Sequence, residues 1–152
     1  MEIERKWLLK EIPDLPVLNH GYIEQFYLSM NPEVRIRRYI ALEGEAYSMY
    51  KLTIKSKGAL SREEMECDIS AEFYQKALRI VNKCPIFKNY WEFNLDRKCL
   101  EVSEVDNNFI YAEIEFDSIE EAKAYSLPFV DAIDITYDSR YKMRKYWKRT
   151  RF

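Results

Sequence analysis

Glycine is scarce in this sequence, and its scarcity excludes the commonest nucleotide-binding patterns. Only 3 of the 152 residues are glycine, and neither a Walker A loop nor a G-x-G-x-x-G fingerprint is present. Tyrosine, in contrast, occurs 12 times, and aromatic residues favour pleated strands. The composition therefore indicates a sheet-rich protein.

Long apolar runs and cysteine pairs are also missing. No segment approaches the roughly 20 apolar residues of a membrane-spanning helix, and residues 1–6 lack the apolar stretch of a signal peptide. The cysteines Cys67, Cys84 and Cys99 are odd in number and lack metal-site spacing, which favours reduced thiols. We therefore expect a cytoplasmic protein without a membrane partner.

The residues that are present fit one globular domain. Hydrophobic residues make up 47% and charged residues 33% of the chain, a balance that excludes disorder and a membrane-embedded fold. No repeat or linker divides the chain, so we expect a single domain over residues 1–152. The net charge of −2 combines 24 basic with 26 acidic side chains and therefore indicates no partner.

Polar and apolar residues alternate with the period of two that is typical of strands. Residues 2–8, for example, place Glu2, Glu4 and Lys6 on one face. The same pattern predicts further strands over about 22–28, 33–40, 47–55, 62–68, 86–93, 99–105 and 110–116. Eight strands are enough to close a barrel. We expect an α+β fold, with a closed or nearly closed antiparallel eight-stranded β-barrel flanked by helices.

Three segments have helical patterns instead. Residues 70–83 carry apolar residues at helical spacing after Ser70, a plausible cap. A capping-box sequence at Ser118 opens a helix through about Ser126. A basic, aromatic helix is expected over 138–149, and its charges predict a solvated face or a plug at one barrel end rather than a nucleic-acid site.

Like charges occur in pairs on the predicted strand faces. The acidic pairs are Glu2/Glu4, Glu64/Glu66 and Glu113/Glu115, and the basic pairs are Arg35/Arg37 and Lys51/Lys55. Each face could be the wet side of a half-buried sheet, which is the commoner arrangement for any one strand. Repeated like-charge pairs repel, however, and they are better explained if a divalent cation lies among the carboxylates and a polyanion among the cations. The polar faces would then point into the barrel.

These residues form part of an ordered set that resembles the CYTH superfamily, the triphosphate tunnel metalloenzymes. Glu2-Ile3-Glu4-Arg5-Lys6 is similar to the E-x-E-x-K motif that opens the family. Similar blocks follow in the family's order at residues 27–29, 35–37, 52–55, 62–66, 112–116, 134–136 and 140–141. The resemblance thus covers essentially the whole chain, and the relatives include bacterial tripolyphosphatases, class IV adenylate cyclases and thiamine triphosphatases.

The resemblance implies a tunnel that binds a triphosphate small molecule with Mg²⁺ or Mn²⁺. The implied metal ligands are Glu2, Glu4, Glu113 and Glu115. The implied substrate-binding residues are Lys6, Arg35, Arg37, Lys55 and Arg62, with Lys51 and Lys88 as further candidates. Glu64 and Glu66 would organise the basic residues or support a second metal. Glu4, which would orient or deprotonate the attacking water, and Lys6 are the candidate catalytic residues.

Three positions depart from the family pattern. Tyr90 occupies a position where the family usually has arginine, Ser103 one where it has aspartate, and Met143 one where it has asparagine. The lost cation and the lost carboxylate either compensate each other or mark a changed substrate or weakened catalysis. His20 lies beside Asn19 in a loop-like stretch and is interpreted as a surface residue rather than a base.

Three functions remain open at this stage. The first is hydrolysis of inorganic tripolyphosphate or a simple organic or nucleoside triphosphate, which the short chain favours. The second is cyclisation of ATP by a class IV adenylate cyclase, and the third is non-catalytic binding of polyphosphate or nucleotide. The oligomeric state is left open between a monomer and a homodimer.

Overall fold

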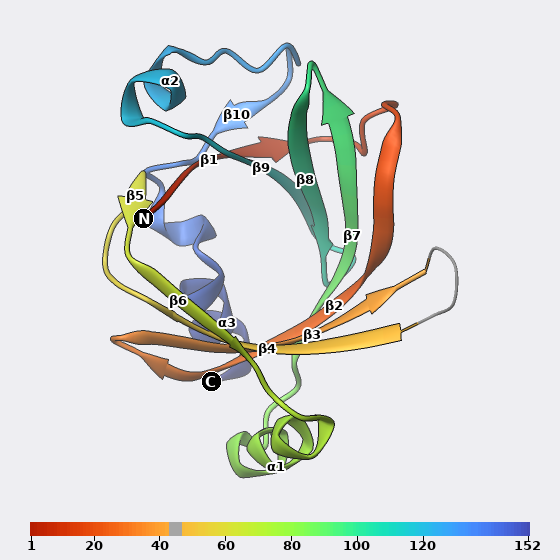
Figure 1. Ribbon diagram of the computed structural model, residues 1–152, viewed down its shortest axis with the longest axis vertical. Coiled ribbons are helices and arrows are strands. Elements are labelled where there is room, and N and C mark those ends of the chain that lie inside the picture. The colour runs from red at the N-terminus through yellow and green to blue at the C-terminus, as the bar shows by residue number, and fades with distance from the viewer. Residues whose placement is uncertain (43–46) are drawn as a thin grey trace.

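The computed structural model describes residues 1–42 and 47–152. Its described residues form one antiparallel sheet of ten strand segments, in the order β10-β1-β9-β8-β7-β2-β3-β4-β6 with β5 paired to β1 (Figure 1). The strands are β1 (Glu2–Leu9), β2 (Val17–Met30), β3 (Glu33–Ala41), β4 (Tyr47–Lys55), β5 (Ser61–Arg62), β6 (Glu64–Asp68), β7 (Ile86–Leu95), β8 (Lys98–Val105), β9 (Phe109–Glu115) and β10 (Ile133–Asp134).

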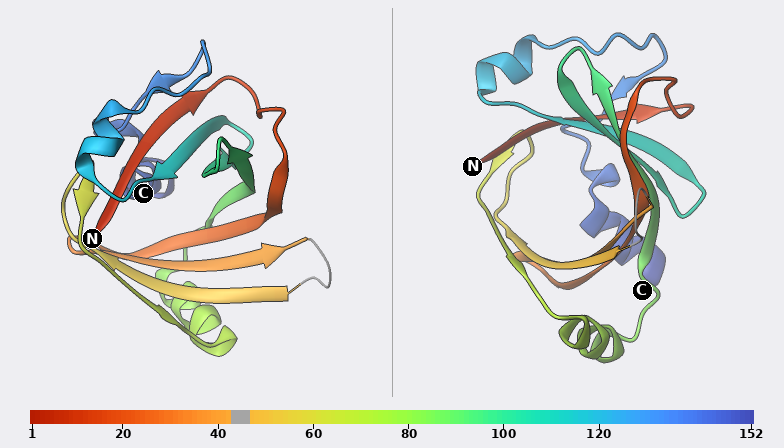
Figure 2. Two further views of the ribbon diagram at one scale, coloured as in Figure 1. Left: turned by 45° about the horizontal axis from the view of Figure 1, so that its top comes forward. Right: turned by 45° about the vertical axis from the view of Figure 1, so that its right-hand side comes forward.

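The sheet curls into a nearly closed barrel, because one segment joins its two sides. β6 pairs with β4, and β5, one residue earlier, pairs with β1, where Arg62 lies opposite Glu2. Figure 2 shows the resulting ring of strands from two further directions. The predicted α+β barrel is confirmed, although the strand expected over 62–68 is divided at Glu63 and the short β10 was not expected.

The strand registers determine which side chains point inward. Arg37 lies opposite Gln25 on β2 and Lys51 on β4, and Glu4 lies opposite Glu115 on β9. Since successive side chains on a strand point to opposite faces, Arg38 points outward, toward Ser48 on the outer face of β4.

Helices cover the apolar outer faces of the barrel. α1 (Ala71–Val81) begins at Ser70, whose hydroxyl accepts a hydrogen bond from the Phe73 backbone, and ends at Asn82 in the left-handed conformation. It packs against β2 and β3. α2 (Ile119–Ala124) is capped by Ser118, as the capping box predicts.

The helix expected over 138–149 is instead two pieces. A 3₁₀ turn, η1 (Ser139–Tyr141), is capped by Asp138. Lys142 then adopts an extended backbone, with φ −69° and ψ 130°, before α3 (Met143–Arg151) begins. The single-helix prediction was wrong, because the extended backbone at Lys142 interrupts the helix. The Lys142 ammonium donates to the Gly58 carbonyl in the loop before β5 at 2.7 Å, a contact between distant segments that local helical pattern does not encode.

Two apolar clusters hold these layers together. One is centred on Phe26, Tyr74 and Trp147 and joins the sheet to α1 and α3. The other, around Trp7 and Ala122, joins β1, β8 and β9 to α2. Among the residues described, no helix combines the length and apolar character needed to cross a membrane.

His20 corrects one sequence-based expectation. It lies within β2 rather than in a loop, and its ring stacks on Trp91 with centroids 4.8 Å apart. Its Nε2 atom lies 2.9 Å from Oδ1 of Asn89. These contacts are on the outer face of the barrel, and the half-buried ring serves packing there.

Candidate active site

The barrel encloses a cavity of about 290 Å³ whose wall is mainly polar. Every residue assigned to the metal or substrate site from the sequence lines it except Lys51. The residues concerned are Glu2, Glu4, Lys6, Arg35, Arg37, Lys55, Arg62, Glu64, Glu66, Lys88, Glu113 and Glu115. The alternating faces of separate strands therefore converge on one space.

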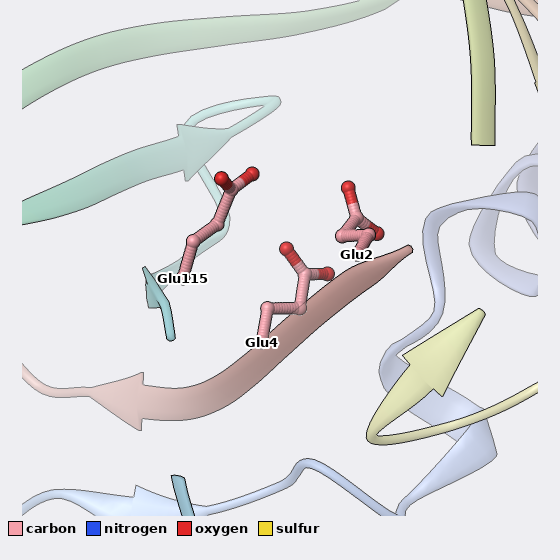
Figure 3. Close-up of side chains that lie close together, drawn as sticks. All are labelled: Glu2, Glu4 and Glu115. Carbon is pink, nitrogen blue, oxygen red and sulfur yellow. The ribbon is translucent and has the colours of Figure 1, made fainter. Parts of the chain in front are cut away.

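Three carboxylates of the cavity meet at one point. Glu2 and Glu4 from β1 and Glu115 from β9 each offer a carboxylate oxygen, and these oxygens lie within 4.8 Å of one another (Figure 3). Burial and the nearby charges of Glu113 and Glu2 raise the pKa of Glu4 well above its usual value. A cluster of hard oxygen donors that repel one another suits a divalent cation such as Mg²⁺ or Mn²⁺.

Glu113 is placed differently from these three. It lies opposite Lys6 in the β1–β9 register. Burial would raise its pKa, but the Lys6 ammonium and a hydrogen bond with Glu4 lower it below the usual value. Glu113 thus bridges the carboxylate cluster and the cations, and its role as a direct metal ligand stays a prediction.

Buried cations occupy the interior of the cavity. The Nε atoms of Arg35 and Arg37 are buried and have no hydrogen-bond partner among the described residues, although Nη2 of Arg37 donates to Gln25 at 3.0 Å. Lys88 is only 1% exposed and donates to the Tyr111 hydroxyl at 2.5 Å. Burial and the charge of Arg37 hold the pKa of Lys88 well below its usual value. Buried cations with unsatisfied donors are costly unless an anion accompanies them.

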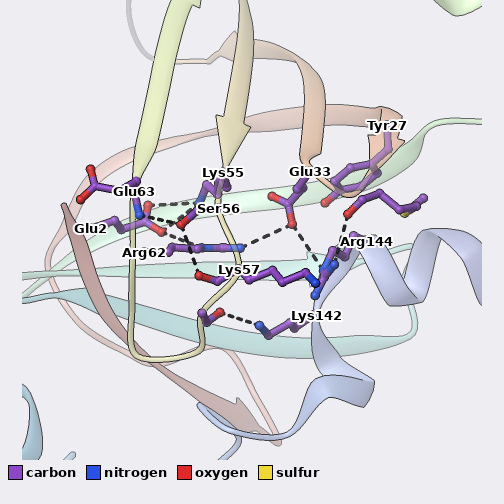
Figure 4. Close-up of polar contacts among 12 residues, drawn as sticks. Glu2, Tyr27, Glu33, Lys55, Ser56, Lys57, Arg62, Glu63, Lys142 and Arg144 are labelled. Atoms are coloured by element: carbon purple, nitrogen blue, oxygen red, sulfur yellow. Dashed lines mark hydrogen bonds and ion pairs between the residues drawn. The ribbon is translucent and has the colours of Figure 1, made fainter.

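Two cations near the point where the barrel closes, Lys55 and Arg62, already have carboxylate partners (Figure 4). The Lys55 ammonium lies 3.0 Å and 3.1 Å from the two carboxylate oxygens of Glu2. Arg62 lies 3.4 Å from Glu2 and 3.5 Å from Glu33, and Arg144 from α3 lies 3.9 Å from Glu33. This network joins both ends of the sheet and the C-terminal helix to the cavity wall.

Lys51 does not line the cavity. It has the inward parity that the sequence predicts, opposite Arg37, but its ammonium forms an ion pair with Asp68 near the end of β6. Parity fixes the face on which a side chain lies, whereas its depth along the barrel depends on the strand register.

Several cavity residues were missed by the sequence analysis. Glu33 and Glu101 line the cavity, and both have the parity of predicted inward residues, which could have identified them. Lys142 and Tyr141 come from the C-terminal segment, and the Tyr141 carbonyl accepts a hydrogen bond from Lys6 at 2.7 Å. No strand periodicity marks this segment, but its resemblance to a family block at residues 140–141 and the expected plug at one barrel end were signals that could have identified it.

Comparison with known proteins identifies relatives over nearly the full length. An inorganic triphosphatase from Nitrosomonas europaea is 30% identical over 145 residues, which cover 93% of each chain. The crystal structure of the inorganic triphosphatase NE1496 matches with a TM-score of 0.66 and 24% identity over 96% of this chain and 93% of that chain. A conserved hypothetical protein from Pyrococcus furiosus matches with a TM-score of 0.57 and 22% identity, covering 81% of this chain and 84% of that chain. No protein-family model matches the sequence.

Proposed function

Because this chain belongs to the CYTH superfamily of triphosphate tunnel metalloenzymes, we propose that it is a divalent-metal-dependent triphosphatase that acts on inorganic tripolyphosphate. The relative from Nitrosomonas europaea, an inorganic triphosphatase by name, supports hydrolysis of a triphosphate. The observation that carries the proposal is that one cavity combines a carboxylate cluster with buried cations. Three carboxylates converge within it, and Arg35 and Arg37 line it with buried Nε donors that have no hydrogen-bond partner among the described residues.

The carboxylate cluster is the proposed metal site. Glu2, Glu4 and Glu115 would hold Mg²⁺ or Mn²⁺, which supplies charge neutralisation and Lewis-acid polarisation of phosphate oxygens when bound. Glu113 and Lys6 lie beside this cluster, and their pairing would keep the Lys6 ammonium at the boundary between metal and phosphate.

The buried cations are the proposed phosphate site. Arg35 and Arg37 present planar guanidinium groups, which match phosphate oxygens well. Their Nε atoms find no hydrogen-bond acceptor in residues 1–42 and 47–152. Lys88 adds a third cation from β7. Preorganised donors of this kind stabilise the negative charge that develops during phosphoryl transfer.

A carboxylate within reach of the terminal phosphate would orient the attacking water. We assign this role to Glu4, which lies opposite Glu115 in the β1–β9 register, because a buried carboxylate of raised pKa is a competent proton acceptor. The water attacks the terminal phosphorus, the bond to the bridging oxygen breaks, and pyrophosphate leaves with the electron pair. Lys6, which lines the same cavity, would stabilise that leaving oxygen.

Product analysis tests the proposal. The purified protein is incubated with tripolyphosphate or ATP, each with Mg²⁺ or Mn²⁺ and with an EDTA control. A triphosphatase releases phosphate from tripolyphosphate only when metal is present. Cyclic AMP formed from ATP would instead show a class IV adenylate cyclase, and substrate binding without any product would show a binding protein.

A further inference from the structure

The cavity has two unlike ends. Antiparallel pairing places the start of β1, the end of β9 and the tip of the β7–β8 hairpin at the same end of the barrel. At the opposite end Tyr141, Lys142 and Met143 line the cavity, anchored to the loop before β5 through the Gly58 carbonyl. The first end, which carries the carboxylate cluster, is therefore the rim through which a phosphate chain would extend.

A second acidic group lies on this rim, on β7 and β8. Glu101 lines the cavity, and its carboxylate accepts a hydrogen bond from the Tyr90 hydroxyl at 3.2 Å. Glu92 is directly opposite Glu101 in the register and accepts a hydrogen bond from Asn19 at 3.1 Å. Asn19 also donates to the Tyr39 hydroxyl at 2.5 Å.

Aromatic contacts hold the side chains around Glu101 and Glu92 in place. The rings of Tyr39 and Tyr90 meet edge to face, with centroids 5.7 Å apart. Tyr39 lies two residues beyond Arg37 on β3 and therefore shares its inward face. A phosphate chain that extends from Arg37 toward the rim thus leaves the buried cations and next meets Glu101 and Glu92.

The part of the rim that β6 contributes is also acidic. Glu64 and Glu66 from β6 line the cavity, and both adjoin an outer groove that contains Glu2, Glu115 and Asp117. The metal and the buried cations can neutralise the charge of a short phosphate chain. The additional phosphates of a longer chain would lie among carboxylates. Phosphate and carboxylate groups are both negatively charged, so they repel each other even when solvent screens the repulsion in part.

We propose that Glu101 and Glu92 limit the length of the phosphate chain, so that the site selects tripolyphosphate over long-chain polyphosphate. This inference rests on the proposed function. It concerns selectivity, which is the difference between the transition-state free energies of two substrates in the same protein. Tyr90 is the positioning residue, because its hydroxyl holds the Glu101 carboxylate at the rim.

The test compares two substrates in each variant. The kcat/KM values for tripolyphosphate and for long-chain polyphosphate are measured for wild type, Glu101→Gln and the double variant Glu92→Gln/Glu101→Gln. The assays are run at pH 8.5, because burial and the charge of Glu113 raise the pKa of Glu101 to about 7. We expect the ratio of long-chain to tripolyphosphate activity to rise about fivefold in the single variant and further in the double variant, because a carboxylate charge is then removed each time. A partial loss of folded protein cancels in this ratio.

A matched control lies on the same strand. Glu104 points to the outer face of β8, between the inward-facing Ser103 and Val105, and Glu104→Gln should leave the ratio within about twofold of wild type. Tyr90→Arg, which would place a cation beside Glu101, should raise the ratio as the double variant does.

Each outcome is informative. An unchanged ratio in the double variant, or a wild type without preference for the shorter chain, would overturn the rim assignment. A wild type that hydrolyses neither substrate would overturn the proposed function instead. In that case the rim assignment is tested by binding instead, as the rise in melting temperature that tripolyphosphate and long-chain polyphosphate each give. Equal rises in wild type and the double variant would overturn the rim assignment.

Discussion

Tyr90 and Ser103 lie directly opposite each other in the antiparallel pair of β7 and β8. These are two positions at which the sequence departs from the family pattern, one by losing a cation and the other by losing a carboxylate. Since they are cross-strand neighbours, a single local exchange replaces a charged pair by a neutral one. The register therefore favours the interpretation in which the two losses compensate each other.

A pair of neighbouring arginines tests the inward face of β3. Arg37→Ala should weaken triphosphate affinity or turnover at least tenfold, about 1.4 kcal/mol, because Arg37 lines the cavity and its Nε atom has no partner in the part of the chain that the structure describes. Arg38→Ala removes the same charge one residue further along the chain. Arg38 points toward Ser48 on the outer face, so its loss should change either quantity less than about twofold. Equal losses in steady-state assays of both variants would point to long-range electrostatics and contradict a direct contact.

The carboxylate cluster predicts a metal-dependent change in stability. Glu4→Gln and Glu115→Gln should each weaken Mn²⁺ binding at least about tenfold, measured as the rise in melting temperature on Mn²⁺ titration. Without metal, Glu4→Gln should melt at the same temperature as wild type or higher, because one of several clustered negative charges is removed. Glu63→Gln is the control, since Glu63 is exposed and lies outside the cluster. A full Mn²⁺ response in both cluster variants would rule out the assigned site.

Asp106 predicts a pH-dependent contribution to stability. Its carboxylate accepts hydrogen bonds from Tyr146 at 2.6 Å, from Arg151 at 2.9 Å and from the Phe87 backbone at 3.0 Å. Burial raises the pKa of Asp106, but these hydrogen bonds outweigh burial and lower it below the usual value. Asp106→Asn should therefore reduce the free energy of unfolding by about 1–3 kcal/mol at neutral pH.

The sign of this pH dependence follows from the lowered pKa. The stabilisation is present above the pKa of an unfolded aspartate, about 3.9, and is lost as the pH falls through the lower folded value. Denaturation of wild type and Asp106→Asn should thus differ most at pH 6–7, and the difference should shrink progressively as the pH falls below about 4. An exposed aspartate, Asp14, provides the control. A difference that does not depend on pH would show that packing, rather than charge, accounts for the loss.

Arg5 on β1 is predicted to contribute to stability but not to substrate binding. Its guanidinium points to the outer face and donates to the carbonyls of Ala122 at 2.8 Å and Tyr125 at 2.5 Å and to the carboxylate of Asp134 at 2.5 Å. Arg5→Met should lower the free energy of unfolding by about 2–4 kcal/mol, because it leaves these acceptors without their donor. Substrate affinity of the folded protein should stay within about twofold. Denaturant titration and a binding assay, with Arg38→Met as the outer-face control, check both statements.

Sequence periodicity predicted the fold and most of the cavity wall, and its failures have physical reasons. Alternation placed Glu4 and Arg37 on the polar faces of their strands, because the period of two is a local property of the backbone. That these faces point inward was inferred from the repeated like-charge pairs and from the family resemblance. The pairing of Lys51 with Asp68 depends on the register between β4 and β6, which local pattern does not encode. Lys142 reaches the cavity only because the helix expected there is interrupted, and its contact with Gly58 joins segments that lie far apart in the chain.

The strand partners of β1 have a consequence for how the chain folds. β1 is the first strand of the described chain, yet it pairs with β5, β9 and β10, the last of which begins at Ile133. Contacts between residues so distant in sequence slow folding, because the entropy of closing the intervening loops is lost before the contacts form. During synthesis the first strand must remain without its β9 and β10 partners until most of the polypeptide has been made. Its Glu2 and Glu4 side chains keep one of its faces hydrated during this interval, so the charges proposed to bind metal in the native protein also oppose premature association of the nascent strand.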